Sequence, residues 1–297
     1  MLLASPAVDA QGWVATRGIV SRRFRYFYVP VPKVASSTLL EMFYAVEGLP
    51  IPERLPGIPD RHSRGPGSLP RLASLREDEQ HTVLSDPSYL RFAVVRNPFT
   101  RVVAAWFNKI WLQSGDQLHI QQEISQWVGR SPNDPPTFGE FVSWIVDTQA
   151  PHACDEHWRP MVHLLGHDQV NYNLIGRIEQ LPSSLAPLAP RLGVSGNDFA
   201  AMLHRSSGNQ SIPFDRRHLY NESTALQVST FYAADFDRYG YDRESWRALV
   251  GAAPPSAADL EAAAVRALRN RGAQAAMLNR SLSEAWRRVF SAAPNEG

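Results

Sequence analysis

Apolar and polar positions divide the chain into short apolar runs, each followed by a turn and an amphipathic stretch. Aromatic and β-branched residues in an apolar run predict a strand, and apolar residues recurring on one face predict a helix. The first such unit is a strand at 24–31, a loop at 32–36 and a helix at 37–47. The second is a strand at 92–95, a turn at 96–98 and a helix at 99–113. Two such units in succession favour an α/β fold with a parallel sheet flanked by helices.

The remaining segments predict three parts. Residues 1–23 read as a polar lead-in, residues 24–245 as the main domain, and residues 250–297 as a C-terminal helical appendix packed on that domain. Within the main domain, prolines and glycines at 48–80 predict a long irregular loop. Further expected elements are one helix within 115–136, a helix at 137–149, a third strand near 170–178 and one helix over 223–241.

Composition excludes several classes of protein. The 297 residues are 44% hydrophobic and 20% charged, with a net charge of +1, so no global field favours nucleic acid or a membrane surface. The single cysteine excludes an internal disulfide. No apolar run approaches the ~20 residues of a membrane span, and no basic segment precedes the apolar start. A soluble, cytoplasmic protein is therefore the default expectation.

Lysine is rare in this chain. Lysine and arginine together number 30, but only Lys33 and Lys109 are lysines. This bias is typical of a high-GC bacterial genome, which makes a lysine in the first turn informative. Lysine is a compact point charge that can lose its proton, whereas arginine is a planar, permanently charged fork.

Both turns carry groups that bind anions. The first offers Lys33 and the backbone N–H groups at the start of a helix, where the helix dipole favours negative charge. The residues that would line it are Lys33, Val34, Ala35, Ser36, Ser37 and Thr38. It is not a Walker A loop, which needs glycines. The second turn places Arg96 at a strand end, with Arg101 one helical turn further on.

These residues resemble those of the sulfotransferases that use 3′-phosphoadenosine 5′-phosphosulfate. "VPKVASST" is similar to the family's 5′-phosphosulfate loop, and "FAVVRNPFTRVVAAWFNK" to its 3′-phosphate element. "HWRPM", "VNYNLIGRIEQL" and "FYAADFDRYGYD" resemble segments of the chondroitin- and dermatan-type carbohydrate sulfotransferases; the uronyl 2-O-sulfotransferases share the first two motifs. The matches cover roughly residues 25–242. The resemblance implies this donor and a fold related to the nucleotide kinases, with four or five parallel strands.

One position departs from the family pattern. A serine eight residues after the arginine usually shares the 3′-phosphate, and here that position is Ala104. Another group is expected to take its place, from Arg101, Arg177 or the loop "HRSSGNQSIPFDRRH". From the family's last cofactor loop, the resemblance carries over Arg205, Ser206 and Ser207.

The reaction that the resemblance implies assigns roles to side chains. A lysine on the oxygen that bridges sulfur and phosphate stabilises the leaving group, which assigns Lys33. The attacking hydroxyl needs a general base, for which His81 is the first candidate and His157 the alternative, with His62 and Glu41 behind them. No metal is required, and no carboxylates cluster near the turns.

Two other functions compete with this interpretation. A P-loop-like kinase of a small molecule would use a similar strand–turn–helix unit, but the Walker glycines are absent. A non-catalytic nucleotide-binding module is the other alternative, to which Ala104 gives some weight. The acceptor is expected to be a sugar hydroxyl, with a lipid or a secondary metabolite as further possibilities.

Overall fold

The computed structural model describes residues 10–55, 58–59, 62–63, 65–111, 118–131, 136–205, 219–249 and 265. Its strands are β1 (Ile19–Ser21), β2 (Tyr26–Val29), β3 (Glu53–Leu55), β4 (Ile58–Pro59), β5 (Leu90–Val95) and β6 (Leu174–Arg177). The helices in the first half of the chain are α1 (Ala10–Arg17), α2 (Ser36–Glu47), η1 (Leu72–Ser74), α3 (Glu77–Ser85), α4 (Pro98–Ala105), η2 (Trp106–Trp111), α5 (Leu118–Trp127) and α6 (Phe138–Thr148). Those in the second half are α7 (Val162–Leu165), η3 (Ile178–Gln180), α8 (Leu181–Ser184), α9 (Leu188–Leu192), α10 (Gly196–Arg205), α11 (Glu222–Phe231), α12 (Ala233–Tyr239) and η5 (Ser245–Leu249).

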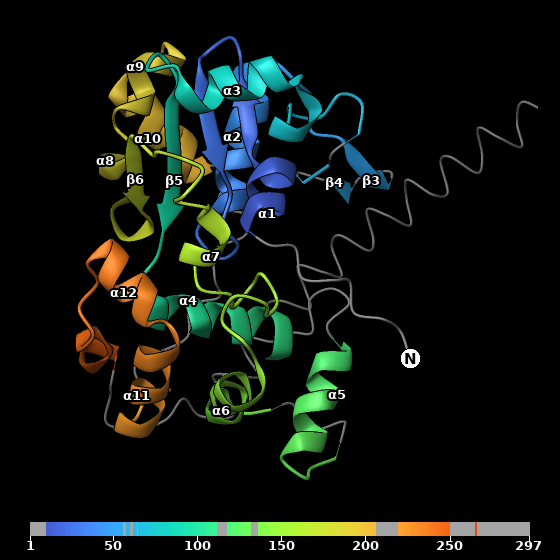
Figure 1. The fold of residues 1–297 in the computed structure, drawn as a ribbon, viewed down its shortest axis with the longest axis vertical. Coiled ribbons are helices and arrows are strands. Elements are labelled where there is room, and N and C mark those ends of the chain that lie inside the picture. Colours follow the sequence, from blue (N-terminus) through green and yellow to red (C-terminus); the bar gives the residue numbers. More distant parts are fainter. Residues whose placement is uncertain are drawn as a thin grey trace, which may run out of the picture.

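The main sheet has four strands in the order β1-β2-β5-β6 (Figure 1). β2, β5 and β6 run parallel, and β1 pairs antiparallel with β2 at one edge. The sequence prediction of an α/β fold with a mostly parallel sheet of four or five strands, flanked by helices, is confirmed. The three predicted strands all form, at 26–29, 90–95 and 174–177.

The strand register brings the ends of the parallel strands to one edge. Val29 pairs with Ala93, and Val95 pairs with Arg177. The loop after β2, the turn after β5 and the end of β6 therefore meet at the carboxyl edge of the sheet. In open α/β sheets this edge is where ligands bind.

Two apolar cores meet at that edge. The first surrounds the sheet, where Phe43 of α2 packs on Tyr26 at 4.7 Å and Phe92 stacks on Tyr28 at 5.0 Å between ring centroids. The second joins α4, η2, α6, α11 and α12, in the lower half of Figure 1. The turns after β2 and β5 point from the first core to the second, so the site lies between them.

Three sequence expectations change in the structure. Residues 10–23 of the expected lead-in form α1 and β1 instead, because Trp13, Val14, Ile19 and Val20 are buried in the first core. The expected irregular loop at 48–80 contains β3, β4 and η1, and α3 begins at Glu77. The single helix expected over 223–241 is two helices, α11 and α12, which meet at Tyr232.

The expected helix at 99–113 also changes character along its length. It is α-helical from Pro98 to Ala105 and continues as a π-helix from Trp106 to Trp111. The C-terminal appendix lies outside the described residues, apart from Val265. Among the helices that the structure describes, none is both long and apolar enough to cross a membrane.

Candidate active site

The first turn has an unusual backbone. Lys33 and Ala35 both adopt left-handed conformations, with φ of 69° and 64°. Residues with a Cβ atom rarely adopt this conformation, and each such residue costs about 1 kcal/mol or more. Backbone strain of this kind concentrates at functional sites, where the surrounding structure holds it in place.

Side chains from three elements hold the carbonyl groups of this turn. Trp13 Nε1 of α1 donates to the carbonyl of Pro30 over 3.0 Å, and Arg101 Nε of α4 donates to that of Pro32 over 3.2 Å. Arg96 Nη1 donates to the carbonyl of Lys33 over 3.0 Å. The prolines end strand pairing, and these long-range hydrogen bonds replace the ladder bonds that the turn lacks.

The amino end of α2 follows directly. The first hydrogen bond within the helix runs from Leu39 N to the Ala35 carbonyl, and no side chain caps the helix. The first turn of α2 therefore directs backbone N–H groups toward the first turn of the site, and a helix amino end of this kind attracts a phosphate or sulfate oxygen. Ser36, Ser37 and Thr38 are partly buried in the first turn of α2, and their expected role at the donor stays a prediction.

The second turn is tied to the end of β6. The backbone N–H of Asn97 donates to Glu179 Oε1 over 2.8 Å, and its side chain donates to Ser245 Oγ over 2.8 Å. Asn97 Oδ1 also caps α4 by accepting from Phe99 N over 3.0 Å. Arg96 is buried, with 7% of its surface exposed, and its Nε donates to Thr100 Oγ1 over 2.9 Å. The turn thus fixes the buried arginine in one position.

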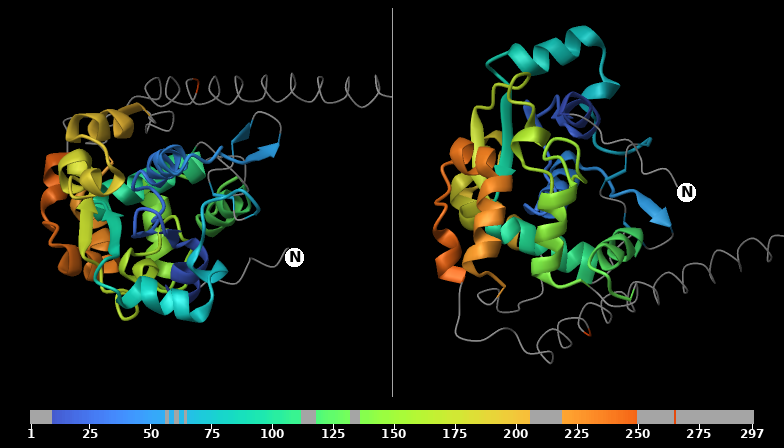
Figure 2. Two further views of the ribbon diagram at one scale, coloured as in Figure 1. Left: turned by 90° about the horizontal axis from the view of Figure 1, so that it is seen from above. Right: turned by 60° about the horizontal axis from the view of Figure 1, so that its bottom comes forward.

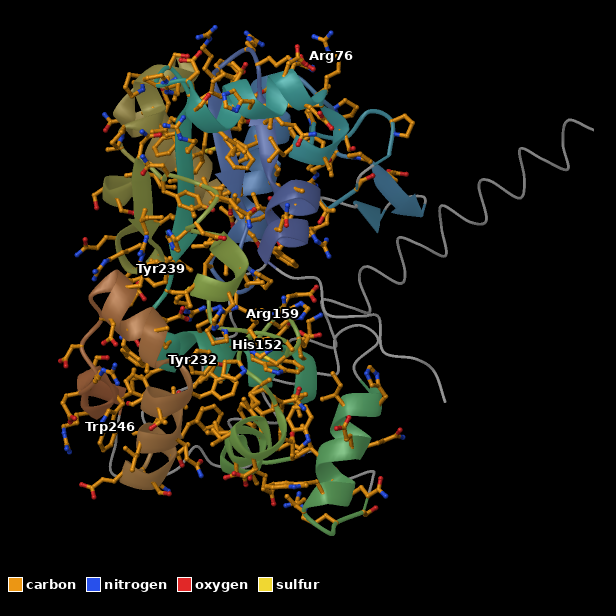
Figure 3. All side chains as sticks on the ribbon, in the orientation of Figure 1. Arg76, His152, Arg159, Tyr232, Tyr239 and Trp246 are labelled. Carbon is orange, nitrogen blue, oxygen red and sulfur yellow. The ribbon has the colours of Figure 1, made fainter. Side chains whose placement is uncertain are left out.

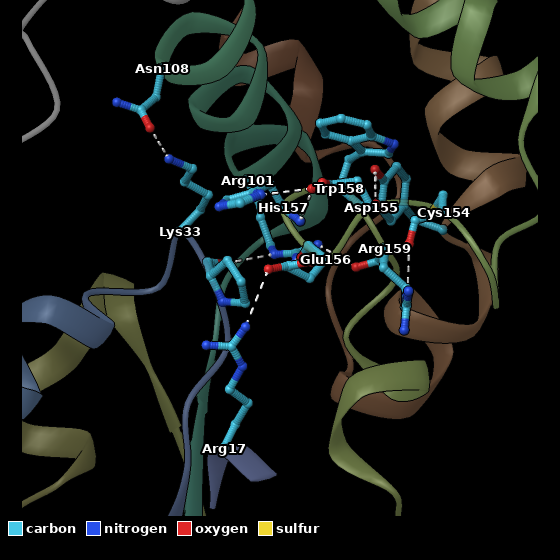
Figure 4. Close-up of polar contacts among 12 residues, drawn as sticks. Arg17, Lys33, Arg101, Asn108, Cys154, Asp155, Glu156, His157, Trp158 and Arg159 are labelled. Atoms are coloured by element: carbon cyan, nitrogen blue, oxygen red, sulfur yellow. Dashed lines mark hydrogen bonds and ion pairs between the residues drawn. The ribbon is translucent and has the colours of Figure 1, made fainter. Parts of the chain in front are cut away.

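Arg101 has a structural role rather than the phosphate contact considered from the sequence. It is 1% exposed. Besides Pro32, it donates to the carbonyls of Arg159, over 2.7 Å, and Glu156, over 3.1 Å (Figure 4). Its guanidinium group therefore joins the first turn to the segment that carries His157.

Lys33 reaches out of the turn toward Asn108 of η2 and donates a hydrogen bond to its Oδ1 (Figure 4). Burial, helped by the positive charges of Lys109, Arg101 and Arg96, lowers the pKa of Lys33 to about 7, although the carboxylate of Asp155 opposes this shift. The site therefore gathers more positive than negative charge around Lys33, which favours an anionic ligand.

His157 lies in the same electrostatic neighbourhood, next to Asp155. His157 Nδ1 lies 2.7 Å from Asp155 Oδ1, and its backbone N–H donates to the same oxygen over 2.8 Å. Burial raises the pKa of Asp155, but the hydrogen bonds and charge of His157 and the charge of Lys109 outweigh it, so that pKa stays below its usual value. An ionised Asp155 can only accept, so Nδ1 carries the proton and Nε2 has the free lone pair.

The protonation state of His157 suits a base. Burial lowers its pKa below the usual value, and the charges of Lys109 and Lys33 act in the same direction, although Asp155 opposes them. The imidazole is therefore neutral at pH 7. The alternative base candidate from the sequence thus lies within electrostatic range of the predicted leaving-group lysine.

His81, the first base candidate from the sequence, lies at the wrong end of the sheet. It is exposed on α3, which leads into the amino end of β5, whereas the site follows the carboxyl end of that strand. Figure 3 shows Arg76, beside the start of α3, far from Arg159 and Tyr239, which lie near the site. The assignment of His81 as the base is therefore wrong.

The other two base candidates differ in position. His62 is exposed in a turn beyond β4, a strand of the small two-stranded sheet outside the main one. Glu41 lies on α2, one turn beyond Ser37, and is partly buried.

Arg177 ends β6 at the correct edge of the sheet. Its guanidinium group stacks on Tyr241, 4.6 Å from the ring centroid, and donates to the carbonyl of Tyr239, so it braces α12 against β6. The ribbons of α12 and β6 lie next to each other in Figure 1 and Figure 2. Ala104 is 9% exposed on α4. Ser206, Ser207 and the side chain of Arg205 lie outside the described residues. The group that replaces the family serine stays a prediction. Because Arg101 is buried and bonded to three backbone carbonyls, the remaining candidates are Arg177 and the loop "HRSSGNQSIPFDRRH".

Two residues of the site were missed at the sequence level, Asn108 and Lys109. Both lie in η2, and Asn108 accepts the hydrogen bond from Lys33. A signal was present, because "WFNKIW" sets a polar pair inside an apolar run and contains the second of only two lysines. Within the described ranges, no three metal-ligating side chains come together, and the expectation of a metal-free site stays a prediction.

A strained turn with a lysine, a helix amino end without a side-chain cap and a buried arginine after the next strand form an arrangement suited to anionic groups. The sulfotransferase family model matches residues 16–242, and the chain belongs to that family. It is 32% identical to carbohydrate sulfotransferase 14 of Mus musculus over 169 residues, which are 55% of this chain and 43% of the relative.

Two further relatives give the same result. Carbohydrate sulfotransferase 11 of Mus musculus is 26% identical over 189 residues, 60% of this chain and 53% of the relative. Carbohydrate sulfotransferase 14 of Danio rerio is 25% identical over 235 residues, 75% of this chain and 61% of the relative. The chain thus spans roughly half the length of these curated relatives, and no solved structure matches it. The relatives named here are vertebrate proteins, and the expectation of a bacterial, cytoplasmic protein rests on composition alone.

Proposed function

We propose that this protein is a sulfotransferase that moves a sulfuryl group from 3′-phosphoadenosine 5′-phosphosulfate to a hydroxyl group of a carbohydrate. One observation carries the proposal. Lys33 lies at the carboxyl edge of the sheet, where Arg96 follows the end of β5. The charge of Lys33 influences the pKa of His157, which is hydrogen-bonded to Asp155. A cation for the leaving group and a neutral base are the two groups that sulfuryl transfer needs from a protein.

The residues at this edge fit the donor. Lys33 and the N–H groups at the start of α2 suit the 5′-phosphosulfate, because a lysine and a helix amino end both attract anions. Arg96 suits the 3′-phosphate, since a guanidinium group binds phosphate oxygens in pairs. The hydrogen bond from Arg96 to Lys33 couples the two halves of this binding site.

The chemistry of transfer assigns each charge to a residue. The acceptor oxygen bonds to sulfur while the bond from sulfur to the 5′-phosphate oxygen breaks, and its electron pair stays on that oxygen. Lys33 stabilises the charge that develops there. Nε2 of His157 takes the proton of the acceptor hydroxyl, and Asp155 holds the imidazole in the required tautomer and stabilises the cation that forms.

The carbohydrate acceptor is proposed from the names of the relatives, all of which are carbohydrate sulfotransferases. The test uses radiolabelled donor with polysaccharides, oligosaccharides, lipids and small hydroxylated metabolites. Wild type is expected to label a carbohydrate, Lys33→Ala to label nothing, and Arg76→Ala, which changes an exposed cation far from the site, to match wild type. Label found only on a lipid or a metabolite would contradict the acceptor class, and bound donor that is transferred to nothing would contradict the activity.

A further inference from the structure

The two lysines of the chain lie within electrostatic range of each other. Of 30 lysine and arginine residues, only Lys33 and Lys109 are lysine. The charge of Lys109 is the strongest of the charges that act on Lys33, and it also acts on Asp155 and His157. A chain that uses arginine for nearly all its positive charges therefore places both exceptions at the proposed transfer site.

The backbone around Lys109 is built to place it there. Trp106, Phe107 and Ile110 of η2 are buried in the second core, and Trp106 Nε1 donates to the carbonyl of Pro136 over 3.0 Å. The polar pair between them, Asn108 and Lys109, is only partly buried. Segments of π-helix are rare and occur often at functional sites. The apolar residues thus anchor the segment, and its polar pair faces away from the anchor.

A direct contact joins this segment to the first turn. Asn108 Oδ1 accepts a hydrogen bond from Lys33 Nζ (Figure 4). The residue next to Lys109 therefore touches the ammonium group assigned to the leaving oxygen. The charge of Lys109 acts on His157 more strongly than that of Lys33 does, so Lys109 is also near the base.

In an in-line transfer the sulfuryl group lies between the leaving oxygen and the attacking oxygen. At this site those positions belong to Lys33 and His157, and the charge of Lys109 acts on both. We infer that Lys109 is a second catalytic lysine, whose ammonium group contacts the non-bridging oxygens of the sulfuryl group of the donor. This inference rests on the proposed function.

Physical chemistry favours a lysine and an anion at this point. Two ammonium groups close together repel each other, and an anion between them removes that repulsion. The sulfuryl group carries such a charge. An ammonium group is compact, whereas a planar guanidinium group beside Lys33 would occupy the space that the sulfuryl group needs. This explains why the arginine bias of the chain is broken twice here.

The experiment compares two ligands that differ only in the sulfuryl group. Calorimetric titration gives the Kd of 3′-phosphoadenosine 5′-phosphosulfate and of 3′-phosphoadenosine 5′-phosphate for wild type, Lys109→Ala and Lys109→Arg. The control is Arg130→Ala, which removes a cation of the neighbouring α5 segment that pairs with Glu140. We expect both Lys109 variants to weaken the donor by roughly tenfold or more, as for loss of a charged hydrogen bond, and the product by far less. The control should change neither.

Each other outcome has a definite meaning. Equal weakening of both ligands would overturn the inference, because Lys109 would then add only to the general positive field. An unchanged donor Kd with a raised acceptor KM would overturn it by placing the lysine against the acceptor. If Lys109→Ala fails to fold, Lys109→Gln keeps the length of the side chain and gives the same comparison. If wild type binds neither ligand, the proposed function fails; if it binds both and the variants keep the ratio, only this inference fails.

Discussion

Arg96 donates a hydrogen bond from Nη1 to the carbonyl oxygen of Lys33 over 3.0 Å. The cation of the second turn therefore fixes the backbone of the first, although 63 residues separate them. Because Lys33 is held in a left-handed conformation, its ammonium group depends on this bond for its direction. The two turns form one binding unit, and a change in one is expected to disturb the other.

Arg96→Ala should affect both donor affinity and rate. It removes the group proposed for the 3′-phosphate, and it also releases the carbonyl of Lys33. We expect Kd for 3′-phosphoadenosine 5′-phosphate to rise by roughly tenfold or more, and the preference over adenosine 5′-phosphate to disappear. Calorimetry with both nucleotides measures this. A retained preference would show that Arg96 does not bind the 3′-phosphate.

Lys33→Arg should be nearly as inactive as Lys33→Ala. Lys33 is partly buried and its ammonium group meets Asn108, so the longer planar fork of arginine cannot occupy the same place. Loss of one donor to a developing charge costs about 2.7–4 kcal/mol, or roughly 10²–10³ in rate. Single-turnover rates with saturating donor give the comparison. If Lys33→Arg retained more than about a tenth of the rate, the leaving-group assignment would be wrong.

Two histidine variants separate the base candidates. His157→Ala should lower kcat by roughly 10²–10⁴, the range typical of general base catalysis, with little change in donor Kd. His81→Ala serves as its control, because His81 is exposed on α3 at the far end of the sheet. Steady-state kinetics of both variants decide the assignment. The reverse pattern, with His81 required and His157 dispensable, would contradict the structure.

The pH dependence of kcat/KM for the donor should be a narrow bell. His157 must be neutral to act as a base. Because its pKa is lowered, His157 loses its proton below pH 7, and the rate should rise with pH over that range. Lys33 must be protonated, and its pKa of about 7 in the free enzyme makes the rate fall above that pH. Lys109→Gln removes a positive charge that lowers this pKa, so the falling limb should move to higher pH. A falling limb that stays in place would contradict the coupling.

Arg101→Met should destabilise the protein. The buried guanidinium group donates to three backbone carbonyls, of Pro32, Arg159 and Glu156, and methionine leaves all three without that donor. Each orphaned buried acceptor costs about 1–3 kcal/mol, so a loss of about 3 kcal/mol or more is expected. Urea unfolding measures it, with the exposed Arg76→Ala as the control. A loss below about 1 kcal/mol would show that Arg101 does not join these segments.

Much of the site could be predicted because its signals are local. The strand at 26–29, the prolines after it and the hydroxyl residues at the start of α2 all act within a few residues of each other. The same holds for Arg96, Asn97 and Pro98 after β5. Parallel order then follows from two strand–turn–helix units, which brings both turns to one edge.

The remainder depends on contacts between distant residues. The prolines and glycines before Glu77 predict an irregular loop, so α3 is not expected from the sequence. Since α3 leads into the amino end of β5, His81 lies at the end of the sheet opposite the site. The hydrogen bonds of Arg101 and the approach of η2 to Lys33 join residues more than 50 positions apart. The burial of α1 could not be predicted from a segment whose apolar residues are few.

If the function proposed here is correct, the two turns bind a 3′-phosphorylated sulfate donor without a metal. Titration of wild type with 3′-phosphoadenosine 5′-phosphate in magnesium-free buffer, set against ATP with magnesium, tests it most directly. We expect saturable binding and a raised Tm with the first ligand, and at most weak effects with the second. Binding and stabilisation by ATP with magnesium alone would contradict the account and favour a kinase.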